Sequence, residues 1–173
     1  HLKAYDICRR GLARTFQVVK PFGNLTVLQN VMVGSFLRTP DARQAREQAM
    51  EVLEFVGLAR QEGKVARSLT ISDRKRLEVA RALATRPRVL LLDEVMAGLN
   101  PTELTEMVET MRRIRQSGVT LIVIEHIMAA IMTVSERIVV LHHGEKIAEG
   151  SPQEVAKDRR VIDAYLGEEY LLA

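Results

Sequence analysis

The sequence predicts an α/β fold: a mostly parallel sheet with a helical subdomain and a C-terminal hairpin and helices. Two continuous apolar runs, residues 89–92 and 120–124, are typical of strands buried on both faces. A helical pattern separates them, which makes a strand–helix–strand unit of about thirty-five residues. Such a crossover forces the two strands to run parallel, so their carboxyl ends lie at the same edge of the sheet.

The composition is that of a globular protein. The 173 residues are 47% hydrophobic and 27% charged, which excludes disordered and fibrous classes. The net charge of +3 comes from 25 basic and 22 acidic residues spread along the chain, so no nucleic-acid partner is expected. Cys8 is the single cysteine, which excludes an internal disulfide framework and suits a reducing compartment. Every apolar run is far shorter than the roughly eighteen residues that span a bilayer.

Residues 24–66 carry helical patterns and are expected to form the helical subdomain. Thr26 begins a capping box ahead of an apolar run. Thr39 is the expected N-cap of a second helix, with Pro40 at its first position. Gly57 is expected to end that helix.

Residues 67–173 are expected to form the α/β subdomain and a C-terminal helical tail, within one domain of 173 residues. Ser72 is the expected cap of an Arg- and Ala-rich helix that ends before Pro87. Asn100 and Pro101 begin the crossover helix.

The C-terminal part is expected to begin with a hairpin. Residues 137–141 and 146–149 flank a His-His-Gly-Glu turn. Ser151 then opens another capping box, and a final short helix is expected to stop near Gly167.

Polar residues follow both predicted strands where they end. Asp93 and Glu94 follow the first strand, and His126 follows the second. Ligands of open parallel sheets bind outside the carboxyl ends of the strands, so these three residues should face one crevice. Paired carboxylates there suit magnesium nucleotide chemistry, in which one holds the hydrated ion and the other orients or deprotonates a water. The alternatives are that the two acids only cap a turn and that His126 is structural.

Five motifs occur in the order found in the ATP-binding-cassette (ABC) family, and the chain resembles that family over essentially its entire length. They are RTFQ (14–17), LTISDRKRLEVARALATRP (69–87), VLLLDE (89–94), AGLNPTE (97–103) and VIEH (123–126). The GLNPTE form, the VLHHGEKIAEG hairpin and the AYLGEEY tail are similar to the branched-chain amino-acid transporter subgroup. The resemblance implies a partial P-loop NTPase-like fold and an ATPase subunit that powers an importer.

The resemblance also implies roles for individual residues, with ATP and Mg2+ as cofactors. Gln17 matches the glutamine that senses magnesium and the γ-phosphate, and Asp93 matches the aspartate that holds magnesium, partly through water. Glu94 matches the general base, and His126 the γ-phosphate switch.

A second group matches the surface that meets another cassette. Thr70, Ser72 and Asp73 fall in the signature loop, which presents a helix N-terminus to ATP on the opposite subunit. Asn100 falls in the loop that crosses the dimer interface. The implied partners are a second ATPase subunit, identical or homologous, the membrane permease subunits and, indirectly, a solute-binding protein. The implied location is peripheral, on the cytoplasmic face of the plasma membrane.

The chain departs from the family pattern in two places. It contains no GxxxxGK[ST] sequence, so we expect a chain truncated at its N-terminus, with an unpaired sheet edge. If each charge-assisted phosphate contact contributes about 1.5 to 3 kcal/mol, losing several would remove the ~8 kcal/mol of a micromolar site. Ile71 and Ser72 also stand where the family places glycines, and a glycine lets the backbone approach phosphate closely.

Two other functions remain open from the sequence. The chain could be a non-hydrolysing interaction module, or a soluble ABC ATPase that acts on nucleic acid. The basic residues Arg74, Lys75, Arg76 and Arg81 are expected to form a solvated helix face. His142 and His143 are expected to be exposed in the hairpin turn, and the apolar segment 18–25 either joins the core or lines a groove for a permease helix.

Overall fold

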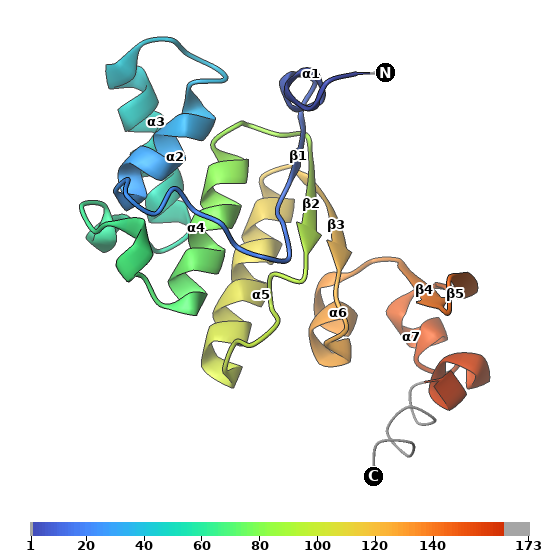
Figure 1. Ribbon diagram of the computed structural model, residues 1–173. Coiled ribbons are helices and arrows are strands. Elements are labelled where there is room, and N and C mark those ends of the chain that lie inside the picture. The colour runs from blue at the N-terminus through green and yellow to red at the C-terminus, as the bar shows by residue number, and fades with distance from the viewer. Residues whose placement is uncertain (1, 165–173) are drawn as a thin grey trace. The chain divides into compact units, whose positions relative to one another are not determined.

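The computed structural model describes residues 2–164 of the chain, which form two compact units divided after His126 (Figure 1). The helices and strands of the first unit are α1 (Ala4–Arg9), β1 (Leu12–Arg14), α2 (Val27–Ser35), α3 (Ala42–Phe55), α4 (Ile71–Leu83), β2 (Val89–Asp93), α5 (Pro101–Gln116) and β3 (Thr120–Ile124), with short 3-10 turns at Ala59–Gln61 and Ala66–Ser68. Those of the second unit are α6 (Met128–Val134), β4 (Ile138–His142), β5 (Glu145–Gly150) and α7 (Pro152–Val155). The helix end expected near Gly167 lies outside the described residues.

The sheet of the first unit is parallel, as the crossover pattern predicts. The strand order is β1-β2-β3, and Asp93 at the end of β2 pairs in register with Ile124 at the end of β3. Leu90 and Leu92 of β2 are buried, while Ile122 and Ile124 of β3 are about half exposed (49% and 57%). In the described part of the chain, β3 therefore ends the sheet with an apolar strand that is only partly covered.

Helices α4 and α5 pack on the sheet, α4 against β1 and β2 and α5 against β3, and Figure 1 shows both on the same side. Helices α2 and α3 pack on each other and on α4, around a core that includes Val31, Leu53 and Leu77. The capping boxes expected at Thr26 and Asn100 are present. Among the described residues, no helix has the length and apolarity needed to cross a membrane.

The predicted start of α3 is wrong by two residues. Asp41, not Thr39, is the N-cap, because its side chain accepts the Gln44 N–H at 2.8 Å. The Thr39 hydroxyl is buried and bonds the Gln44 side chain and the Asp41 N–H, which places Pro40 before the helix. Gly57 follows the helix with φ +78°, a conformation that favours glycine.

The second unit contains the predicted hairpin. Strands β4 and β5 are antiparallel, and the Ser151 capping box begins α7. Its core is formed by Ile138, Ala148, Val155 and Val161.

Candidate active site at the ends of three parallel strands

Three parallel strands end at the same edge of the sheet, and each is followed by residues expected to function. β1 leads into Gln17, β2 into Glu94, and β3 into His126. The ends are joined by backbone contacts: the Glu94 N–H donates to the Ile124 carbonyl at 2.9 Å, and the Asp93 N–H donates to the Thr15 hydroxyl at 3.1 Å. The acids and His126 therefore follow strands that end at the same rim.

Gln17 and Glu94 are in direct contact. The Gln17 Nε2 donates to the Glu94 Oε2 at 2.6 Å, although the two residues are 77 positions apart. This bond leaves the Glu94 Oε1 to accept from another donor, such as a water. Glu94 has φ +47°, in the left-handed region that non-glycine residues seldom adopt. An unusual backbone conformation at a carboxylate next to a strand end is typical of a functional site.

Asp93 is paired with an arginine that the sequence did not single out. The Arg14 guanidinium donates to the Asp93 Oδ2 at 2.9 Å, with side-chain exposures of 54% and 19%. Because the Arg14 side chain is about half exposed, a cation could take its place beside Asp93 at modest cost.

The oxygen donors here fit magnesium bound together with phosphate. Among the described residues, no three His, Cys, Asp or Glu side chains gather into a metal site. Magnesium, however, commonly takes only one or two carboxylates, with water and substrate phosphates as its other ligands. Asp93 and the Gln17 amide offer ligands of that kind.

His126 is exposed, two residues beyond the end of β3. Its neighbour Glu125 accepts the Met96 N–H at 2.6 Å. Burial raises the pKa of Glu125 above its ordinary value, with a further increase from nearby Glu94, and the Met96 bond and the proximity of His126 and Lys75 offset only part of this.

The other expected site residues lie at the starts of α4 and α5. Thr70 is the N-cap of α4 and accepts the Asp73 N–H at 3.1 Å, while the Asp73 carboxylate accepts from Gln61 at 3.0 Å. Ser72 is therefore not the cap. Because the helix begins at Ile71, Ser72 lies inside the first turn, where it is only 6% exposed. Ile71 itself is 67% exposed at the helix start. Asn100 caps α5 and accepts the Glu103 N–H at 3.0 Å.

The expectation of a solvated basic face on α4 is wrong for Lys75, which is 7% exposed. Lys75 lies on the buried stripe of α4 with Ser72, Val79 and Ala82, at spacings of three, four and three residues. That spacing in the sequence could have shown that Lys75 belongs to the buried face of the helix. Its ammonium group is desolvated, which lowers its pKa, and nearby glutamates raise it in turn.

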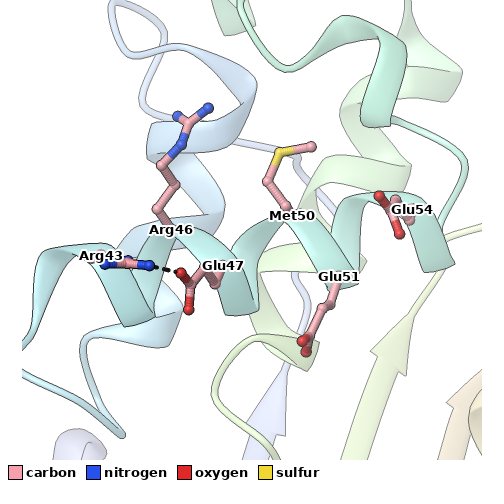
Figure 2. A pocket seen from close by; sticks show the side chains of 6 residues that line it. All are labelled: Arg43, Arg46, Glu47, Met50, Glu51 and Glu54. Carbon is pink, nitrogen blue, oxygen red and sulfur yellow. Dashed lines mark hydrogen bonds and ion pairs between the residues drawn. The ribbon is translucent and has the colours of Figure 1, made fainter.

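A surface hollow elsewhere in the first unit has no part in this chemistry. Figure 2 shows that its lining comes from α3 alone, with Arg43 and Glu47 joined by an ion pair at 3.1 Å. Both side chains are exposed, so the hollow is a groove along one helix face and lacks converging polar groups.

Comparison with known proteins identifies the family. The model of the ABC transporter family matches residues 2–97, which include Gln17, Asp93 and Glu94. The chain belongs to the ABC transporter family. Residues 145–170 of this ABC protein also match a model described as "Branched-chain amino acid ATP-binding cassette transporter".

Known relatives of this ABC protein align with nearly its whole length. The high-affinity branched-chain amino acid transport ATP-binding protein LivG of Salmonella typhimurium is 38% identical, over 96% of this chain and 72% of the relative. The corresponding protein BraF of Pseudomonas aeruginosa is also 38% identical, with the same coverage. The crystal structure of an ATP-binding cassette of an ABC transporter in its ADP conformation superposes with a TM-score of 0.82 at 26% identity, over 96% of this chain and 72% of that one.

Proposed function

We propose that this chain is the ATP-hydrolysing subunit of an ABC importer for branched-chain amino acids. The observation that carries the proposal is the Gln17–Glu94 bond of 2.6 Å beside Asp93, at the edge where the three parallel strands end. The names of the LivG and BraF relatives support the branched-chain solute.

In this proposal Glu94 is the general base. Gln17 holds one carboxylate oxygen of Glu94, so the other accepts a proton from the attacking water. Asp93, now paired with Arg14, and the Gln17 amide oxygen are the groups that would hold Mg2+. Bound Mg2+ supplies charge neutralisation on the phosphate oxygens. His126, just beyond the end of β3, would donate a hydrogen bond to the terminal phosphate.

A second cassette, identical or homologous, completes the site. Thr70, Ser72 and Asp73 belong to the first turn of α4, a helix of 13 residues whose N-terminus favours anions. Because Ser72 is buried, we assign the trans phosphate contact to the exposed Thr70 and the backbone around Ile71 rather than to the Ser72 hydroxyl. Asn100 lies in the loop assigned to the dimer interface.

Permease subunits at the cytoplasmic face of the membrane are the second kind of partner. The segment after Gln17 exposes apolar side chains, with Val18 65% and Phe22 46% exposed. We assign it to the docking of a permease helix, through which a solute-binding protein would act indirectly.

The test is turnover by Glu94→Gln. The chain is extended at its N-terminus with a segment that carries a GxxxxGK[ST] sequence, because residues 1–173 contain none. We expect Glu94→Gln to bind ATP normally and to hydrolyse it at least about a hundredfold more slowly, the scale of a lost general base. His126→Ala should also reduce hydrolysis.

Unchanged turnover in Glu94→Gln would refute the assignment of the base, and normal activity in His126→Ala would remove His126 from the mechanism. Binding of ATP without any hydrolysis by the unmutated extended chain would favour a non-hydrolysing module. Stimulation by nucleic acid rather than by permease would favour the soluble ATPase.

A further inference from the structure

The turn from Glu94 to Ala97 is held by two side chains from other elements. Lys75 of α4 reaches it with its Nζ, which donates to the Glu94 carbonyl at 3.0 Å and to the Ala97 carbonyl at 2.5 Å. Glu125, just after β3, accepts the Met96 N–H at 2.6 Å. Three backbone groups of this four-residue turn are therefore bonded to charged side chains from outside it.

These bonds act on the residue with the least favourable backbone conformation in the site. Glu94 has φ +47°, and such a conformation persists in a non-glycine residue only where its surroundings fix it. The Glu94 N–H is bonded to Ile124 of β3 and its carbonyl to Lys75 of α4. Both peptide groups of Glu94 are thus fixed by neighbouring elements, which sets the direction of its side chain.

Lys75 is buried where a charged group is costly unless it is bonded. It is 7% exposed, and a buried ammonium needs partners for its three donors. Two donors have carbonyl partners on the turn, and the charge lies near Glu125, Glu94 and Glu78. A packing role alone would be met by an apolar side chain, so the amine is best explained by the turn that it holds.

The same helix holds the loop that carries Gln17. Glu78, one turn after Lys75, is 8% exposed and accepts the Phe16 N–H at 2.8 Å. One helix therefore fixes the backbone next to Gln17 and the backbone of Glu94, the two residues that meet at 2.6 Å.

We propose that Lys75 and Glu125 are positioning residues that clamp the Glu94–Ala97 turn and so aim the Glu94 carboxylate. The inference rests on the proposed role of Glu94, which supplies the kinetic readout, but the clamp itself can be measured without ATP. α4 begins at the surface that we assign to contact with the opposite subunit. The clamp therefore also links that surface to Glu94, the proposed general base of the same subunit.

The first measurement is hydrogen exchange on the unextended chain. Lys75→Met keeps the length of the side chain and removes its donors, so we expect amides 94–97 to exchange about tenfold faster or more, while α5 keeps its protection. Lys75→Arg keeps donors and should restore much of the protection. Lys64→Met makes the same chemical change on an exposed lysine and should leave residues 94–97 as in the unmutated chain.

The second measurement is kinetic, on the extended chain. Lys75→Met should lower kcat about tenfold or more and leave the KM for ATP within about twofold, because the aim of the base changes while phosphate binding does not. Lys75→Arg should recover most of the loss.

Three results would overturn the clamp. The first is a folded Lys75→Met chain whose amides 94–97 exchange as slowly as in the unmutated chain. The second is a Lys75→Arg chain in which protection of these amides does not recover. The third is a rise in KM with constant kcat in Lys75→Met. If Lys75→Met fails to fold, hydrogen exchange is measured in Glu125→Leu instead. This variant removes the acceptor for the Met96 N–H, so amides 94–97 should exchange faster. Normal protection of these amides in Glu125→Leu would also contradict the clamp. If the extended unmutated chain does not hydrolyse ATP, the proposed function fails and the exchange result still decides the clamp.

Discussion

Glu78 is a buried carboxylate whose two oxygens have different surroundings. Its Oε1 accepts the Phe16 N–H at 2.8 Å, while its Oε2 is buried without a hydrogen-bond partner in the described structure. Burial raises the pKa of Glu78, and the Phe16 bond and the positive charges of Arg81 and Lys75 lower it less strongly. The fold therefore favours the protonated form of this acid.

That preference gives a pH dependence to the free energy of unfolding. A raised folded pKa means that the folded chain keeps the Glu78 proton to higher pH than the unfolded chain. The contribution of Glu78 to stability is therefore complete below its ordinary pKa of 4.5 and is lost as pH rises from there through the folded pKa. Glu78→Gln keeps an oxygen for the Phe16 N–H and does not titrate. We expect its free energy of unfolding, relative to the unmutated chain, to increase as pH rises through this window.

The measurement is urea unfolding of both proteins at several pH values from about 4 to 8. Glu47→Gln, which changes a carboxylate that is 60% exposed on α3, controls for the loss of one acid in general. A difference in unfolding free energy between Glu78→Gln and the unmutated chain that stays constant over this range would contradict the expected titration.

At the scale of elements, sequence patterns within a few residues correctly predicted the features that depend on neighbouring residues alone. The apolar runs of β2 and β3 and the crossover between them were enough to predict a parallel pair, and this prediction is confirmed. The capping boxes at Thr26 and Asn100 are also confirmed, because each depends on side chains three residues apart.

Other features could not be predicted because distant groups decide them. Strand β1 has three residues and is defined by its pairing with β2, 77 positions away. Thr70 rather than Ser72 caps α4, although both are good capping residues in the sequence. The partners of Lys75 and Glu125 are carbonyls and an N–H of a turn on another element, and no local pattern reveals such a contact.

The packing of α2 on α4 depends on one glycine. A Cβ at Gly34 would lie 2.4 Å from the Arg81 carbonyl oxygen and 3.0 Å from the Ala84 Cβ. Alanine would ordinarily favour a helix interior by about 0.5–1 kcal/mol over glycine, but this clash with backbone of α4 should reverse the sign. We expect Gly34→Ala to destabilise the chain by about 1–3 kcal/mol, measured by urea unfolding.

Gly63→Ala is the matched control, since a Cβ there meets nothing within 4 Å. Its free energy of unfolding should change little. A Gly34→Ala chain as stable as Gly63→Ala would show that the two helices can separate without loss.

At the scale of the whole molecule, the two units differ in the size of their cores. The cluster around α2, α3 and α4 joins twelve buried residues, and in the described part of the second unit the corresponding cluster joins four. Strand β4 also exposes Val139 by 47% and Leu141 by 69%. Because opening free energy follows the apolar area that is buried, the second unit should open more easily than the first.

Hydrogen exchange can test this difference in the intact chain. We expect amides of β4 and β5 to exchange at least about tenfold faster than those of β2, through opening that leaves the first unit folded. Mass spectrometry of peptides covering residues 89–93 and 138–150 would measure both rates, and a low concentration of urea should raise the rate for 89–93 more than the rate for 138–150, because opening of the second unit alone exposes less surface. Equal rates that rise together with urea would instead mean that the chain opens only as one cooperative unit, and the smaller core would then owe its protection to the larger one.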